Sequence, residues 1–126
     1  MDIDDDLVRL LAELASIAGG RGLAEPAEAL VGALVALRPD SERPYLIQAL
    51  GQLNLGDANG AERILRDRAL KTNPSSAMAL AYLGLVLHQQ GRMSERDQVL
   101  RAALDSPDGD ADAERLARSL LAAPPA

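Results

Sequence analysis

Few residues in this chain have side chains that could do chemistry, and His88 is the first to consider because it is the single histidine among 126 residues. A histidine can relay protons near neutral pH or bind a metal ion. A metal site needs further ligands, yet the chain has no cysteine and its acids lie elsewhere in the sequence. We therefore expect His88 to be a polar residue at the edge of a binding surface.

The other patterns that are typical of catalysis are also missing from the sequence. Gly19-Gly20-Arg21-Gly22 has the glycine content of a phosphate-binding loop, but it follows an expected helix and not a strand. No carboxylate pair and no Ser/His/Asp arrangement emerges, and the lack of cysteine removes thiolate chemistry and disulfides. The sequence predicts a protein that is not an enzyme, with no catalytic, cofactor-binding or metal-binding residues.

Charge and composition exclude several classes of partner. A net charge of −6 repels a phosphate backbone, and the 13 basic residues are dispersed among acids, so we expect no nucleic acid partner. No apolar run reaches the roughly 18 to 20 residues that span a bilayer, so we expect no membrane insertion. The first ten residues carry acids where a secretory signal would carry basic charge, which favours a cytoplasmic protein. The acids near both ends of the chain are interpreted as solubilising and as helix N-terminal charge.

The elements that must position any functional surface are helices arranged as a repeat. Leu80, Leu83, Gly84 and Leu87 follow the apolar-x-x-Leu-Gly-x-x-apolar signature of a tetratricopeptide helix. The three leucines share one face, and the small Gly84 lets a second helix approach closely. This stretch therefore predicts an antiparallel helix pair, which needs further copies to bury its faces.

The spacing of glycines and prolines supplies those copies. Gly22, Gly56 and Gly91 are 34 and 35 residues apart, which matches the tetratricopeptide period. The closing prolines, Pro39, Pro74 and Pro107, recur at 35 and 33 residues. We predict an all-α fold in which three helix-turn-helix repeats form a short right-handed α-solenoid with a C-terminal capping helix. The chain is expected to be a single domain, with repeats at about 6–39, 42–74 and 76–107 and a capping helix at about 110–122.

Departures from the repeat pattern cluster in the second unit. Gln48 and Gln52 occupy core positions of the second unit, and one extra residue lies between Leu65 and Pro74. In the third unit Arg96 replaces the usual alanine, which suggests looser packing where the last helix docks. The spacing from Ser94 to Asp97 resembles a capping box at the start of that unit's second helix.

In a repeat of this kind the first helix of each pair lines a concave groove. The residues expected to face this groove are Ala12, Ser16, Gly19 and Gly20 of the first unit, Leu46, Leu50, Leu53 and Asn54 of the second, and Met78, Ala81, Leu85, His88 and Gln89 of the third. Most of them are apolar or small, whereas a groove for a terminal carboxylate would present Lys, Arg and Asn. The pattern predicts a groove for a partner's amphipathic helix.

Three alternatives to this interpretation remain open at the level of sequence. The leucines Leu46, Leu50 and Leu53 could be covered by the chain's own N- or C-terminal helix, which would close the bundle. The chain could be a general tetratricopeptide scaffold that joins folded proteins through charged ridges. It could also associate with itself through the apolar groove.

Three blocks of the sequence resemble one family of helical chaperones. In order along the chain they are LLAELASIAGGRGLAEPAEALVGAL, YLIQALGQLNLGDANGAERIL and ALDSPDGDADAERLARSL. They are similar to the small tetratricopeptide chaperones of type III secretion needle subunits, the YscG/PscG type, over almost the whole chain. The Arg38-Pro39-Asp40 segment also resembles a related group of plant-pathogen secretion proteins.

The resemblance implies a function as well as a fold. It implies a non-enzymatic cytoplasmic chaperone of type III secretion, involved in virulence, whose groove holds the amphipathic C-terminal helix of the needle subunit and prevents premature polymerisation. A second small helical co-chaperone usually joins such a complex. The apolar groove inferred from the repeat register agrees with this function.

Overall fold

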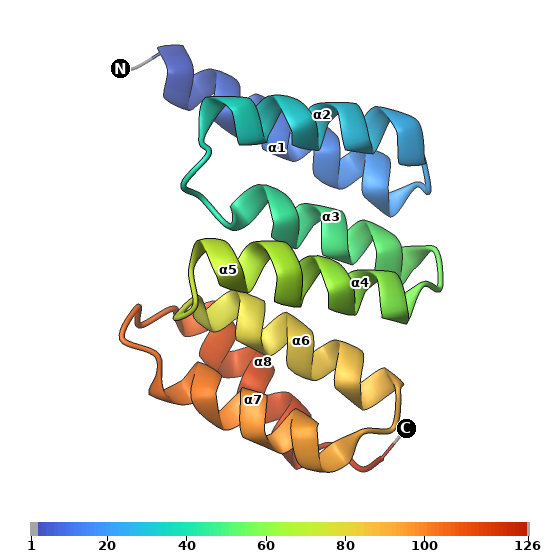
Figure 1. Ribbon diagram of the computed structural model, residues 1–126, viewed down its shortest axis with the longest axis vertical. Helices are drawn as coiled ribbons and strands as arrows, with labels where there is room; N and C mark the ends of the chain where they lie inside the picture. The colour runs from blue at the N-terminus through green and yellow to red at the C-terminus, as the bar shows by residue number, and fades with distance from the viewer. Residues whose placement is uncertain (1–2, 126) are drawn as a thin grey trace.

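Helix pairs stack one on another along the long axis of the molecule (Figure 1). The computed structural model describes residues 3–125. The first pair is α1 (Ile3–Gly20) and α2 (Ala24–Leu37), and α3 (Arg43–Asn54) begins the second pair. Its partner is one continuous helix made of α4 (Ala58–Ile64), the π-helical turn η1 (Leu65–Ala69) and α5 (Leu70–Thr72). The third pair is α6 (Ala77–Gln89) and α7 (Met93–Asp105), and α8 (Ala111–Ala122) follows it.

This architecture confirms the predicted all-α tetratricopeptide-like solenoid. Among the described residues no strand occurs and no helix is long and apolar enough to cross a membrane. The first and last pairs lie at opposite ends of the stack, and α8 packs on α6 and α7 (Figure 1).

Local chemistry explains where the helices begin and end. The carboxylate of Asp57 accepts a hydrogen bond from the amide of Gly60, and the hydroxyl of Ser76 accepts one from the amide of Ala79. The predicted turn glycines adopt the left-handed conformation that ends a helix, with φ of 72° at Gly22, 80° at Gly56 and 74° at Gly91.

The capping box expected at Ser94 and Asp97 is wrong. Helix α7 begins at Met93, and its N-terminal flanking residue, Arg92, makes no side-chain cap. Arg92 instead donates to both carboxylate oxygens of Glu62 on α4 and to Glu95, at 2.7–3.2 Å. The turn is therefore held by charged pairs between helices.

The extra residue in the second repeat takes the form of a π-helical turn. Nine positions separate Leu65 from Pro74, but eight separate the equivalent Val31 from Pro39. A single added residue can be absorbed in a helix as a π-bulge, and η1 begins at Leu65. Leu65 and Ala69 stay fully buried, so the bulge lets the helix keep its apolar face on the core.

The core is aliphatic and continuous between the second and third pairs. Leu46 and Ala49 of α3 pack with Leu65 and with Leu83 and Val86 of α6. A second cluster joins α6, α7 and α8, and a third joins α1 to α2. Gly84 lies against Leu100, as the close helix approach predicted for this glycine requires.

Candidate functional site

A hollow of about 700 Å³ opens on the side of the molecule formed by the first helices of the pairs. Its lining comes from α1, α3 and α6, from the connections that precede α3 and α6, and from the segment around the start of α8. The lining residues are Ala12, Glu42, Arg43, Leu46, Ile47, Asn73, Ser76, Met78, Tyr82, Asp108, Asp110 and Asp112. We call this surface the concave hollow.

One side of the concave hollow is apolar and is built on three helices. Ala12 comes from α1, Leu46 and Ile47 from α3, and Met78 and Tyr82 from α6. Met78 and Tyr82 also pack against the core of the second and third pairs, which fixes their positions. Three successive repeats therefore line this part of the hollow together, and a partner's apolar side chains can be buried against all three.

Another part of the lining is acidic because the segment between α7 and α8 returns to the start of α6. Asp108 accepts a hydrogen bond at 2.9 Å from the amide of Ala77, at the first residue of α6. Asp110 accepts bonds from the amides of Asp112 and Ala113 and so caps α8. These contacts agree with the helix N-terminal charge expected for the acids at this end of the chain. They also gather three carboxylates on one rim.

Tyr82 lies where the apolar and acidic parts of the hollow meet. Burial raises the pKa of the Tyr82 phenol, and the negative charge of Asp110 raises it further. The hydroxyl therefore stays protonated at neutral pH and can donate a hydrogen bond to a guest.

The predicted groove residues divide into three groups in the structure. Ala12, Leu46 and Met78 line the concave hollow. Ser16 lies beside it, in a shallow hollow on α1 with Arg9, Ala12, Glu13 and Ile17. The remaining residues are placed elsewhere: Gly19, Gly20, Leu50, Leu53, Asn54, Ala81, Leu85, His88 and Gln89.

Helix α8 accounts for much of this difference. Ala81 is fully buried in the cluster that includes Ala113 and Ala117 of α8, and Leu85 packs on the same cluster. Leu53 packs on the core between the second and third pairs. The chain's own last helix thus covers part of the surface that the repeat register assigned to a partner. Leu46 still lines the hollow but is only 8% exposed, because it packs in the core between the second and third pairs.

The polar members of the predicted set make contacts within the chain. Asn54 donates to the carbonyl oxygen of Gly19 at 3.4 Å, at the junction of the first two pairs. His88 Nδ1 lies 2.9 Å from a guanidinium nitrogen of Arg96, and Gln89 is exposed. Among the described residues, no group of three His, Cys, Asp or Glu side chains could hold a metal ion.

The lining residues that the sequence did not point to are Ile47 and Tyr82, the three aspartates, and Glu42, Arg43, Asn73 and Ser76 from the connections and the start of α3. Ile47 follows Leu46, which also lines the hollow, and Tyr82 follows Ala81, about 100° further around the helix. The true orientation of α6 therefore differs from the one that the repeat register assigned. The aspartates belong to a segment that is distant in sequence, and only the return of the chain after α7 brings them to the hollow.

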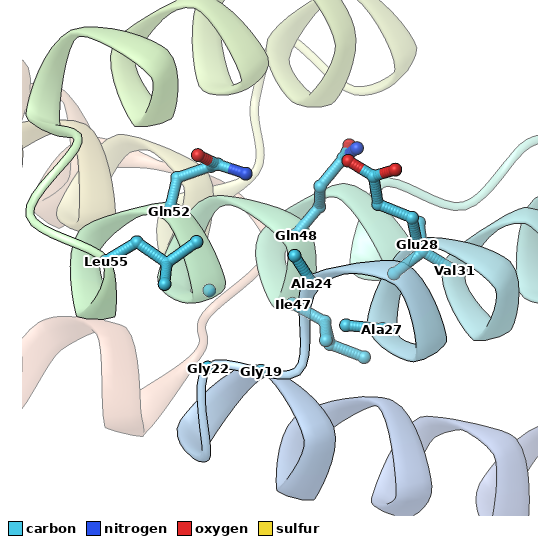
Figure 2. Close-up of a pocket in the computed structure, with 11 residues that line it drawn as sticks. Gly19, Gly22, Ala24, Ala27, Glu28, Val31, Ile47, Gln48, Gln52 and Leu55 are labelled. Atoms are coloured by element: carbon cyan, nitrogen blue, oxygen red, sulfur yellow. The ribbon is translucent and has the colours of Figure 1, made fainter.

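A second cavity lies between the first pair and α3, but it is too small for a partner (Figure 2). Its volume is about 20 Å³, which is room for about one water molecule. Figure 2 shows the side chains of Gln48 and Gln52 pointing to the same side of α3, away from Gly19 and Gly22. Gln48 accepts a hydrogen bond from Arg68 at 3.1 Å, so this glutamine contributes to packing between α3 and η1.

Solved structures confirm the fold. The tetratricopeptide domain of Arabidopsis OM64 matches with a TM-score of 0.67 and 17% identity, covering 94% of this chain and 97% of that domain. A mutant O-GlcNAc transferase of Thermobaculum terrenum matches with a TM-score of 0.69 and 22% identity over 96% of this chain. This chain spans only 23% of that enzyme.

The family assignment comes from the sequence. No curated protein sequence matches this chain. The model of a bacterial type III secretion protein family, HrpB1_HrpK, matches residues 1–123. Together with the fold, this match confirms the predicted resemblance at the level of a tetratricopeptide-type protein of type III secretion. The chain belongs to the HrpB1_HrpK family of bacterial type III secretion proteins.

Proposed function

We propose that this protein is a non-enzymatic chaperone of type III secretion that holds an amphipathic helix of a needle subunit in the concave hollow. The observation that carries the proposal is the make-up of that hollow, which combines apolar residues from three successive repeats with three aspartates from the segment before and at the start of α8. An amphipathic helix has an apolar stripe that can cover the apolar residues and a polar face that can meet the aspartates.

The apolar side defines what the guest must present. Ile47 and Tyr82 are half-buried and lie on adjacent first helices, so each keeps apolar surface that a guest can cover. A helix packs at about 8–10 Å from its neighbour when apolar residues at three- and four-residue spacing fill such a surface. If the apolar stripe of the needle subunit's helix is covered in this way, it cannot make the contacts through which subunits polymerise.

The acidic rim defines the polar side of the guest. Asp108, Asp110 and Asp112 would attract lysine or arginine on the flank of the bound helix and repel a helix with acidic flanks. Complementary charge raises the rate of encounter and fixes the orientation of the guest more than it raises affinity. We infer that the complex forms in the cytoplasm before export, and that a small helical co-chaperone can join it.

Co-expression with the needle subunit encoded in the same secretion gene cluster tests the proposal. We expect a soluble complex of the two proteins in which the needle subunit does not polymerise. Tyr82→Ala removes apolar contact and should weaken binding about tenfold or more. Asp112→Lys reverses one exposed rim charge and should mainly slow association. The matched control is Leu55→Ala, since Leu55 is 51% exposed and does not line the concave hollow.

Two outcomes would reject the proposal. One is the absence of a soluble complex although both proteins are folded by circular dichroism. The other is binding whose affinity is unchanged by Tyr82→Ala and whose association rate is unchanged by Asp112→Lys, but which is lost on substitution of exposed charges on α4 or α7. That second outcome would favour the general scaffold.

A further inference from the structure

Helix α1 carries an apolar stripe that the rest of the described chain leaves about half exposed. Leu7, Leu10, Leu14 and Ile17 are 40%, 52%, 43% and 52% exposed. Their three- and four-residue spacing places them along one face of the helix. Ala12 of the concave hollow lies about half a turn away around the same helix. The stripe is therefore a surface distinct from the proposed binding site.

The repeat register shows what this face does elsewhere in the molecule. The residues of α6 equivalent to Leu10, Leu14 and Ile17 are Ala79, Leu83 and Val86, each 0–1% exposed. They pack against Leu46, Ala49 and Leu65 of the preceding pair. In α3 the equivalent of Ile17 is Gly51, which meets Gly19 of the first pair. Helix α1 thus presents, uncovered, the face through which the other pairs stack on their predecessor.

The other end of the stack is closed in a different way. Helix α8 turns its alanines and leucines onto α6 and α7 and leaves polar residues outside. The exposed outer residues of α8 include Asp112, Arg115, Arg118 and Ser119. A second copy therefore cannot continue the stack from head to tail, because a polar end would meet the apolar stripe.

We propose that the stripe of α1 pairs with the same stripe of a second copy, in an antiparallel arrangement about a twofold axis. The spacing of the four residues reads the same in both directions, with intervals of three, four and three. Antiparallel pairing sets Leu7 against the partner's Ile17 and Leu10 against the partner's Leu14. Both contacts occur twice, as a twofold interface requires.

The charges on α1 favour the antiparallel orientation. Asp4, Asp5 and Asp6 occupy the first turn of the helix, and Arg21 follows its carboxyl end. Antiparallel pairing brings the acidic first turn of one copy toward the carboxyl end and Arg21 of the other, with opposed helix dipoles. Arg9 and Glu13 lie on one flank of the stripe, where the twofold axis places them near the partner's Glu13 and Arg9.

Parallel pairing lacks these advantages. It would set the three aspartates of one copy beside the same aspartates of the other, and like charges repel. The dimer expected here leaves the concave hollow of each copy open, so the inference does not depend on the proposed chaperone function.

Sedimentation equilibrium of the full chain tests the proposal. We expect the mass to rise from monomer to dimer and to stop at the dimer. Leu10→Glu and Leu14→Glu should each shift the equilibrium to monomer, by about a hundredfold or more in dissociation constant, while Leu55→Glu at a similarly exposed leucine leaves it unchanged. A wild-type chain that stays monomeric up to millimolar concentration would overturn the proposal, as would a dimer insensitive to both stripe substitutions.

Cysteine cross-linking tests the orientation, since the chain has no cysteine of its own. Leu10→Cys and Leu14→Cys are prepared separately and oxidised alone and as a mixture. The antiparallel arrangement predicts a disulfide-linked dimer mainly in the mixture, between one copy of each variant. Efficient cross-linking of each variant with itself, without a mixed disulfide between the two variants, would contradict the antiparallel register.

Discussion

Gly84 of α6 lies directly against Leu100 of α7, and a Cβ atom placed on Gly84 would come within 2.3 Å of Leu100 Cδ2. Leu100 is fully buried, so it has little room to move away. The two helices can approach this closely because Gly84 has no side chain. This contact joins the two helices of the third pair and fixes the position of α6, which carries Met78 and Tyr82 of the concave hollow.

Substituting Gly84 by alanine should therefore destabilise the protein. The added methyl group forces Leu100 out of its rotamer or moves α7, which costs about 1–3 kcal/mol in the free energy of unfolding. Urea denaturation measures this change. Gly32→Ala on α2 is the control, since its Cβ would meet nothing within 4 Å, and we expect it to stabilise the helix by up to about 1 kcal/mol. Equal effects of the two substitutions would contradict the close contact.

Arg96 should hold the end of α8 in place. Its side chain is only 7% exposed, and its guanidinium donates to the carbonyl oxygen of Ala123 at 3.2 Å and to Asp97 at 3.0 Å. We expect Arg96→Ala to cost about 1–3 kcal/mol because the part-buried Asp97 and Ala123 lose their hydrogen bonds and the buried side chain of Arg96 leaves a cavity. Amide hydrogen exchange should increase most in the last turn of α8, and the exposed Arg101→Ala should leave it unchanged. Unaltered exchange in α8 with Arg96→Ala would show that Arg96 does not anchor this helix.

Stability should depend on the ionisation of Glu62. Burial alone raises the pKa of this carboxyl, but hydrogen bonds from Arg66, Gln90 and Arg92 outweigh it and leave the pKa below its ordinary value of 4.5. A pKa that is lower in the folded state stabilises the protein above the unfolded value, and this contribution is lost as pH falls through the folded value. Glu62→Gln should therefore be less stable than wild type at pH 7, by about 1 kcal/mol.

The pH series supplies the decisive comparison for Glu62. The difference in unfolding free energy between wild type and Glu62→Gln should shrink as the pH is lowered below 4.5. A difference that stays constant from pH 7 down to pH 3 would contradict a stabilising role for the ionised carboxylate of Glu62.

The π-helical turn should tolerate the loss of one residue. Deleting Asp67 gives the second repeat the same spacing to its closing proline as the first, so η1 can become an ordinary α-helix. We expect a folded protein with a melting temperature within several degrees of wild type. Deleting Arg101 from the regular helix α7 should rotate Ala103 and Leu104 out of the core and unfold the third pair. The prediction fails if the two deletions are equally damaging in thermal denaturation.

The repeat itself could be predicted from the sequence because it depends on local signals. Turn glycines such as Gly56 and helix caps such as Ser76 act within a few residues, so spacing alone places the helices. The extra residue after Leu65 was visible as well, but a count of residues cannot distinguish a longer loop from a π-helical turn.

The surface could be predicted less well because it depends on helix rotation and on contacts distant in sequence. Ala81 was expected in the groove and is instead covered by α8, whose docking also buries Arg96. A buried arginine with hydrogen-bonding partners contributes to that docking, so the looser packing expected around Arg96 is wrong. The acidic rim depends on Asp108, which lies 31 residues from its partner Ala77.

Photo-cross-linking from inside the concave hollow tests the chaperone account most directly. A benzophenone amino acid is placed at Tyr82, and a control is placed at Arg63, which is exposed on α4 outside the hollow. In the complex with the needle subunit, we predict a cross-link from position 82 to the subunit's amphipathic helix and none from position 63. A stable complex that cross-links from position 63 and not from position 82 would contradict the proposed binding site.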